Sequence, residues 1–252
     1  MVSEPTLTTL KQSDPDRCRA AMFAPPQGRQ DLLLLYAFHY ELAKVPEIVS
    51  EPMIGQIRYQ WWRDCIDEIY SGGTKRVRSH EISTPLSEML LRVDMPRFWV
   101  DRLIDGRARD LDPEPFKSVD VARDYAAHTS GVLMQMAVKT LGVEPDDAVL
   151  QAGQAWGLTG LARAWRYYQG GILSELDYGV ICEAAHMSHM QAAKSIANLP
   201  AKAFPAIAYA ALVPKFLAKL THSGHDAAKD AVNYGPLSKR LTLMRAVMRG
   251  KI

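Results

Sequence analysis

The chain has 252 residues, of which 48% are apolar and 23% are charged, an ordinary composition for a globular protein with a sizeable core. Its net charge is only +2, so it does not have the excess of basic residues that nucleic-acid-binding proteins carry. No nucleic acid is therefore expected as a partner. Its three cysteines, Cys18, Cys65 and Cys182, are odd in number and far apart, which argues against a disulfide framework and favours a reducing, cytoplasmic compartment.

Helical periodicity runs through nearly the whole chain. Residues 1–16 contain no apolar run, and so match neither a signal peptide nor a transit peptide. The pair Asp14-Pro15 supplies an N-cap and a proline at the first helical position, which predicts a short helix ending near residue 23. Further helices are expected at residues 29–45 and 50–70, from residue 84, and at 96–109, 118–142, 145–169, 186–198, 201–220 and 226–248.

No strand-like alternation and no linker interrupt this pattern. The chain is therefore predicted to be all-α, a single helical domain over residues 1–252 with about ten helices. The longest apolar run, residues 203–213, is shorter than the ~20 residues that a membrane-spanning helix needs. No transmembrane helix is predicted.

Residues 36–70 form the most informative segment, which begins Tyr-Ala-Phe. It resembles the first substrate-binding helix of the squalene/phytoene synthase family, in which a similar start leads to two aspartates four residues apart. The matching positions here are Ala43 and Glu47, with Lys44 where a further aspartate often stands. Carboxylates at i and i+4 share a helix face and are suited to holding Mg²⁺ on a diphosphate. Alanine supplies no ligand and lysine repels the cation.

The second motif of that family corresponds to residues 157–178. Arg163 matches the family's arginine, but the two aspartate positions hold Ala164 and Tyr168, and Gly160 stands where asparagine is common. The resemblance implies an isoprenoid synthase fold whose two motif helices face one another across a central cleft that has lost its acids. The cleft residues implied are Tyr36, Tyr40, Ala43, Lys44, Glu47, Gly160, Arg163, Ala164 and Tyr168.

Within the family, the run Glu41-Leu42-Ala43, together with Ser50-Glu51, Ile54-Gly55 and Trp62, is similar to the members that lack the aspartates and serve as mitochondrial complex I assembly factors. This resemblance implies a non-catalytic scaffold with no catalytic residue, no resident metal and no cofactor. Its partner would be a protein client in the membrane complex. It would act from the cytoplasm, peripherally at the inner membrane, or from the mitochondrial matrix in a eukaryote.

Two alternatives stay open. A prenyl transferase that condenses two isoprenoid diphosphates head to head would need Mg²⁺, held by carboxylates such as Glu47, Asp110 and Asp177. A non-catalytic carrier would bind an isoprenoid or another lipid in the cleft instead.

Basic residues suggest two further sites. Lys44, Arg163 and Arg166 either bind an anion directly, since the arginine fork matches phosphate oxygens, or pair with neighbours such as Glu47. Residues 239–252 combine basic and apolar side chains without an acid. They either contact an anionic membrane surface or form a terminal helix packed on the bundle.

Two potential metal-binding patterns have plainer interpretations. The acids at positions 64–68 lie beside an arginine and are expected on a solvated helix face. Cys182, His186 and His189 share a helix face, but a zinc site needs three or four converging ligands, so structural histidines are favoured.

Overall fold

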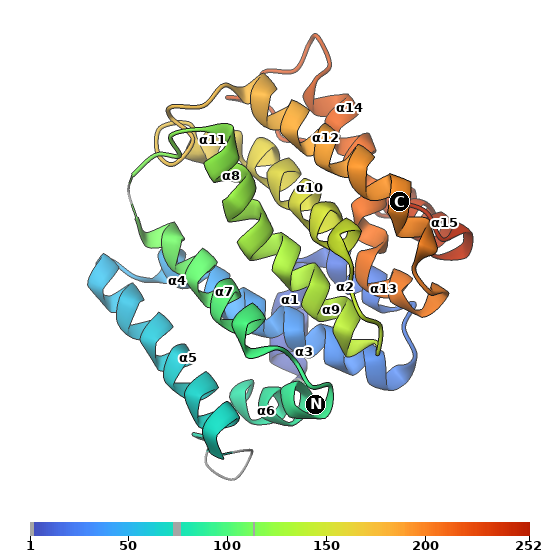
Figure 1. The fold of residues 1–252 in the computed structure, drawn as a ribbon. Helices are drawn as coiled ribbons and strands as arrows, with labels where there is room; N and C mark the ends of the chain where they lie inside the picture. Colours follow the sequence, from blue (N-terminus) through green and yellow to red (C-terminus); the bar gives the residue numbers. More distant parts are fainter. Residues whose placement is uncertain (1–2, 73–76, 113) are drawn as a thin grey trace.

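The computed structural model describes residues 3–72, 77–112 and 114–252, and none of these forms a β-strand (Figure 1). This confirms the all-α prediction. In chain order the α-helices are α1 (Glu4–Ser13), α2 (Pro15–Ala21), α3 (Pro26–Ala43), α4 (Val45–Ile48), α5 (Pro52–Gly72), α6 (Ser83–Arg92), α7 (Arg97–Ala108), α8 (Val119–Ala126), α9 (Val132–Thr140), α10 (Asp147–Arg163), α11 (Trp165–Tyr168), α12 (Tyr178–Ser195), α13 (Phe204–Ile207), α14 (Val213–Leu220) and α15 (Pro236–Arg249).

The two motif helices, α3 and α10, each bury ten residues in the bundle. Residues 31–39 of α3 are buried on every side, as the continuous apolar run predicts for a central helix. The helix ends at Ala43, and Pro46 lies in the single turn α4 that follows, because a proline has no N–H with which to continue a helix. Helix α3 packs on α1, α2, α6, α7 and α9, whereas α10 packs on α8, α9, α12 and α14.

Helices α8 and α9 form one continuous rod joined by a π-helical turn, Ala127–Gly131. The rod begins at Ser118, whose side chain accepts a hydrogen bond from the N–H of Val121, as its sequence predicts. Helix α10 crosses the rod at the π turn in backbone contact. A Cβ atom on Gly153 would lie 2.5 Å from the carbonyl oxygen of Ser130 and 2.6 Å from Cα of Gly131. Glycine is therefore required at this crossing.

The structure differs from the sequence-based expectation near both ends. Helix α1 was not predicted, because its only fully buried residue is Leu10 and the segment shows no apolar stripe. The expected helix over 226–248 begins only at Pro236. Before it, the carboxylate of Asp226 accepts a hydrogen bond from the N–H of Ala228, a local turn that competes with a helix.

The stretch Ala201–Leu220 is broken into short α and 3₁₀ turns rather than one regular helix, with Pro205 and Pro214 at turn starts. By length and hydropathy alone it could cross a membrane, but 72% of that window is buried inside the fold. Burial against the other helices accounts for its apolar composition, since the core helix of a globular domain is equally apolar.

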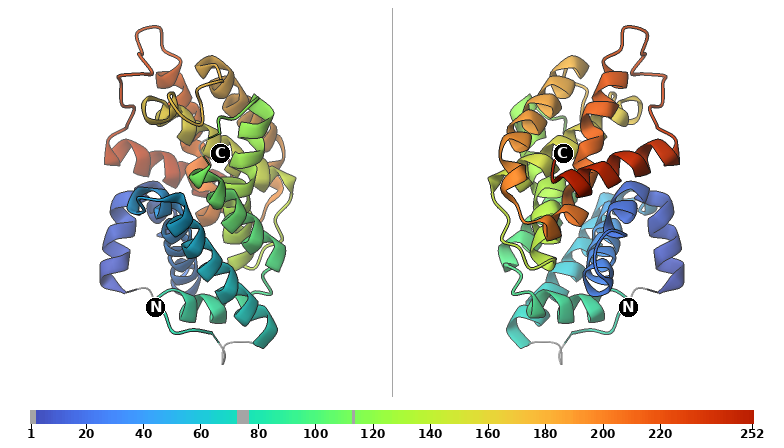
Figure 2. Two further views of the ribbon diagram at one scale, coloured as in Figure 1. Left: turned by 90° about the vertical axis from the view of Figure 1, so that its left-hand side faces the viewer. Right: turned by 90° about the vertical axis from the view of Figure 1, so that its right-hand side faces the viewer.

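Helix α15 packs against the segment Ala208–Leu212 and against α2, which brings the two ends of the chain together (Figure 2). Lys239 is only 4% exposed and its Nζ lies 2.8 Å from Asp16 Oδ2 of α2. Leu243 and Ala246 are buried on the same side. Of the two alternatives for residues 239–252, the structure shows a terminal helix packed on the bundle, and Lys239 contributes an ion pair that holds it there rather than a charge in water.

Candidate functional site

We call the first-motif residues on one face of α3 and α4 (Tyr36, His39, Tyr40, Ala43, Lys44 and Glu47) the first motif stripe, and the corresponding residues of the second motif the second motif stripe. The first stripe runs from the core to the surface. Tyr36 and His39 are buried, whereas Glu47 is exposed. The ammonium group of Lys44 pairs with Glu41, one turn earlier on the same helix, rather than with Glu47. The remaining stripe residues, Tyr40 and Ala43, are partly buried.

The second motif stripe lies at the end of α10 and in α11. The guanidinium carbon of Arg163 stacks 4.0 Å from the ring centre of Phe216 on α14. Burial lowers the pKa of Arg163, against the opposing charges of Asp16 and Asp14. Its Nε is buried without a hydrogen-bond partner among the described residues.

Part of this second stripe lines a pocket of about 400 Å³. Gly160, Arg163 and Ala164 contribute to it, together with Tyr167 and residues 231–233. Arg166 stacks on Tyr167 at 4.6 Å from its ring centre. The three basic residues at 44, 163 and 166 thus each contact a different set of neighbours, so direct anion binding by them stays a prediction.

A hydrogen-bonded network joins α3 to α7 and α8 beside the motif stripes. Arg107 Nη1 on α7 lies 3.1 Å from Asp110 Oδ2 and donates to Tyr125 Oη of α8 at 3.0 Å. The Tyr125 hydroxyl donates to Asp110 Oδ1 at 2.6 Å. Arg107 Nη2 lies 2.9 Å from His39 Nε2, and arginine can only donate, so this imidazole nitrogen accepts.

The charged groups of the network act on one residue of each motif stripe: the positive charge of Arg107 acts on His39, and the negative charge of Asp110 acts on Tyr168. Burial first, and then the charges of Arg107 and Arg17, lower the pKa of His39 well below its usual value. His39 is therefore neutral, as its acceptor role requires. Burial, and then the carboxylate of Asp110, raise the pKa of Tyr168. These effects place residues of both motif stripes around one Arg–Asp–Tyr group.

Arg17 on α2 is a second cation inside the bundle and is 5% exposed. Its guanidinium group donates to Asp14 at 2.6 Å and to Ser130 of the π turn at 3.4 Å, and lies 5.1 Å from the ring centre of Tyr209. Burial lowers the pKa of Arg17, but the charges and hydrogen bonds of Asp14 and Tyr209 together outweigh this and raise it overall. The charge of Arg17 also reaches Tyr36 of the first stripe.

The residues at the motif positions do not fit a Mg²⁺–diphosphate site. Ala43, Ala164 and Tyr168 supply no carboxylate, and Asp110 already faces Arg107. Across the described ranges, no three His, Cys, Asp or Glu side chains converge in a way that could hold a metal ion. Of the carboxylates that the prenyl transferase alternative would use to hold Mg²⁺, Glu47 is exposed and that of Asp177 caps α12.

The other metal-ligand patterns found in the sequence do not form a converging ligand set among the described residues either. Glu68 forms an ion pair with Arg78, and Asp67 with Arg97. In the Cys-His pattern, Cys182 and His189 are buried but His186 is exposed.

Sequence reasoning missed two arginines inside the bundle, of which Arg17 is buried and Arg107 is partly buried. Arg107 and Arg17 look like ordinary surface cations along their helices, because arginine is rarely buried. The one local signal for Arg17 is its N-cap partner Asp14, three residues earlier. Asp110 was noted in the sequence. Its partner Arg107 lies only three residues earlier, whereas its partner Tyr125 comes from α8 and could not be read from its surroundings.

Comparison with known proteins is consistent across sequence and structure. The family model for squalene/phytoene synthase matches residues 10–169. Complex I assembly factor 6 from Homo sapiens is 25% identical over 250 residues, covering 87% of this chain and 74% of that protein. A 15-cis-phytoene synthase from a Paracoccus species is 28% identical over 170 residues, covering 61% and 53%.

Solved structures of the same family share the fold. A dehydrosqualene synthase in complex with ligand superposes with a TM-score of 0.74 at 14% identity, covering 97% of this chain and 94% of that one. Squalene synthase HpnC from Alicyclobacillus acidocaldarius gives 0.68 at 13% identity, covering 85% and 91%. The isoprenoid synthase type of bundle is thereby confirmed. The chain belongs to the squalene/phytoene synthase family.

Proposed function

We propose that this chain is a non-catalytic member of its family that acts as an assembly factor for respiratory complex I. The observation that carries the proposal is which residues occupy the aspartate positions of the two motif helices. They occupy central positions in the bundle, yet their aspartate positions hold Ala43, Ala164 and Tyr168, and the nearest acid, Asp110, pairs with Arg107.

The electrostatics of the bundle interior support this proposal. Ionisation of an allylic diphosphate requires the leaving group's charge to be neutralised, which Mg²⁺ on several carboxylates supplies. Here the charges of Arg107 and Arg17 act on His39 of the first motif helix, and such positive charges would repel a metal cation. The proposal therefore includes no catalytic residue, no metal and no cofactor.

The identity of the proposed client is inferred from the proteins to which this chain is similar. Complex I assembly factor 6 from Homo sapiens and from Bos taurus matches 87% of this chain, whereas the phytoene synthase matches 61%. The protein would act as a rigid helical body on a client of the membrane complex. Contact with the membrane itself would be peripheral, through the exposed side of α15.

Deletion of the gene in cells that make this protein tests the role in assembly. We expect fully assembled complex I to fall severalfold on native gels while the other respiratory complexes stay unchanged, with recovery when the wild-type chain is restored. Normal complex I in the deletion strain would contradict the proposal.

The prenyl transferase alternative has its own test. We expect the purified protein with Mg²⁺ to give no turnover of farnesyl or geranylgeranyl diphosphate, because the metal-binding carboxylates are missing. Mg²⁺-dependent product above the no-enzyme background would overturn the non-catalytic assignment. Binding of either diphosphate without Mg²⁺ and without turnover would favour the carrier instead.

A further inference from the structure

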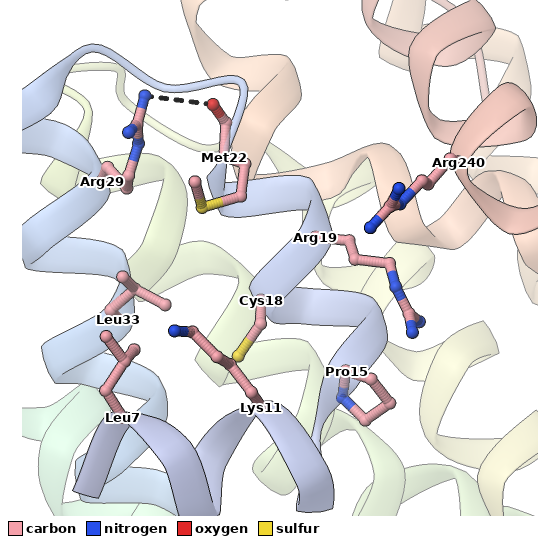
Figure 3. A pocket seen from close by; sticks show the side chains of 9 residues that line it. All are labelled: Leu7, Lys11, Pro15, Cys18, Arg19, Met22, Arg29, Leu33 and Arg240. Atoms are coloured by element: carbon pink, nitrogen blue, oxygen red, sulfur yellow. Dashed lines mark hydrogen bonds between the residues drawn. The ribbon is translucent and has the colours of Figure 1, made fainter. Parts of the chain in front are cut away.

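A cavity of about 440 Å³ lies between α1, α2, α3 and α15, away from the motif stripes (Figure 3). Leu7, Leu33 and Cys18 give it an apolar wall, and Met22 stands at its edge. A second pocket of about 370 Å³ continues from it along α15. Both volumes fall within the ~300–1,000 Å³ typical of small-molecule sites.

The two pockets form one groove, since Arg19, Met22 and Arg240 line both. We call this the α2–α15 groove. Beyond it, α15 exposes a row of large apolar side chains. Leu237 is 74% exposed and Met248 is 77% exposed. Apolar surface of this kind is costly in water and favourable in the interface of a bilayer.

The rim of the groove is basic. Lys11, Arg19, Arg29 and Arg240 line the larger pocket, and no acidic residue lines either pocket. Figure 3 shows the side chains of Arg19 and Arg240 on one side and those of Leu7 and Leu33 on the other. The chemistry is that of an apolar channel with a cationic mouth.

Most of these cations lack a carboxylate partner. Arg19 pairs with Asp16, and Arg29 donates to the backbone carbonyls of Met22 and Ala24. Within the described part of the chain, no acidic side chain lies within ion-pairing distance of Lys11, Arg29 or Arg240. The nearby acid Asp16 is already shared between Arg19 and Lys239. The rim therefore keeps positive charge available for an external anion.

We propose that the α2–α15 groove binds an anionic phospholipid, with an acyl chain in the apolar pocket and the phosphate at the basic rim. A lipid combines both features in one molecule, whereas a free phosphate would leave the apolar walls exposed and a neutral lipid would leave the cations unpaired. The inference deepens the membrane contact proposed for α15 and rests on it, but its test uses purified protein and needs no complex I.

The first measurement is calorimetric titration of the protein with single-chain lipids below their critical micelle concentrations. Lysophosphatidylglycerol and lysophosphatidylcholine of equal chain length share the acyl chain and the phosphate, but the first carries a net negative charge and the choline of the second cancels it. We expect the anionic lipid to bind at least about tenfold more tightly, because each basic residue contributes ~1 kcal/mol toward an anionic lipid surface. Equal affinities would overturn the role of the basic rim.

Two matched pairs of variants locate the site. Arg240→Glu should weaken binding of the anionic lipid on the order of tenfold, whereas Arg58→Glu on α5, which is equally exposed to solvent, should not. Met22→Glu should weaken binding of both lipids, because it places a carboxylate in the channel. Met187→Glu on α12 is its control, since both methionines are 52% exposed.

The outcomes separate the proposal from its rivals. Unchanged lipid affinity in Met22→Glu would mean that the acyl chain binds elsewhere, and would overturn the assignment to this groove. Equal losses in Arg240→Glu and Arg58→Glu would show that net charge alone drives binding. Binding to phosphatidylglycerol vesicles without binding of the single-chain lipid would show surface docking with no chain in the pocket, and would also overturn it. Thermal unfolding of each variant checks that it is folded.

Discussion

At the scale of single residues, the lost acids and the arginines inside the bundle are parts of one change in charge. Ala43, Ala164 and Tyr168 offer no carboxylate at the motif positions, but the polar side chains around these positions still need hydrogen-bond partners. Arg107 achieves this through partners on three different elements. Asp110 is best explained as the acceptor that this guanidinium group needs, because breaking a buried charge pair costs several kcal/mol.

Neutral buried histidines make the protein sensitive to acid. Burial, and then the charge of His186, lower the pKa of His189 to about 4, and the pKa of His39 is lowered as well. An unfolded histidine takes up a proton below about pH 6.5. The contribution of these neutral histidines to the free energy of unfolding should therefore be fully present above pH 6.5. It should decrease as the pH drops toward 4. His189 alone should contribute a loss of about 2 kcal/mol by pH 5.

Urea unfolding at pH 7.5 and pH 5 measures this loss. His189→Gln should reduce the difference in stability between the two pH values by about 2 kcal/mol. His186→Gln, which changes an exposed histidine of the same helix, should leave most of it in place. An unaltered pH dependence in His189→Gln would show that the buried imidazole does not control it.

At the scale of elements, the fold depends on two close contacts between segments far apart in sequence. One is the crossing of α10 over the π turn at Gly153. The other is the buried Lys239–Asp16 pair, which joins the last helix to the second. Each contact fixes an element that is weakly specified by its own sequence, so tertiary packing rather than helix propensity determines where these helices lie.

Two glycines of α10 give opposite predictions for the same substitution. Gly153→Ala should destabilise the fold by about 1–3 kcal/mol, because the new methyl would overlap backbone atoms of the π turn. Gly160→Ala has no atom within 4 Å of the new methyl and should stabilise the helix by up to about 1 kcal/mol. Chemical denaturation of both variants measures these effects. A stable Gly153→Ala protein would mean that the two helices can separate without cost.

The elements that could be predicted are those whose signals are local. The caps at Asp14 and Ser118 and the break at Pro46 depend on neighbouring residues, and the structure has each in place. The position of Arg17 and Arg107 inside the bundle could not be predicted from their local carboxylate partners, because the residues that enclose them, such as Tyr209 and Tyr125, come from other elements. Family resemblance located the motif helices, but it could not reveal which side chains surround them.

At the scale of the whole molecule, exposed apolar side chains occur both at the α2–α15 groove and on α5. In Figure 1, α15 lies on the right and α5 on the left. On α5, Met53 is 73% exposed and Ile57 is 64% exposed, although the sequence places Ile57 in an apolar stripe. A scaffold that holds a client at a membrane needs two such regions, one for each partner.

Restoring the missing aspartates tests whether the interior is still suited to catalysis. The triple variant Ala43→Asp, Ala164→Asp and Tyr168→Asp recreates the family's acidic positions. We expect no Mg²⁺-dependent turnover of farnesyl or geranylgeranyl diphosphate, because the new carboxylate at 168 would lie beside the Arg107–Asp110 pair and interact with the guanidinium group rather than with a metal. An active phytoene synthase assayed in parallel is the positive control. Turnover by the folded triple variant would mean that loss of the aspartates alone, and not the arginines inside the bundle, separates this protein from the enzymes of its family.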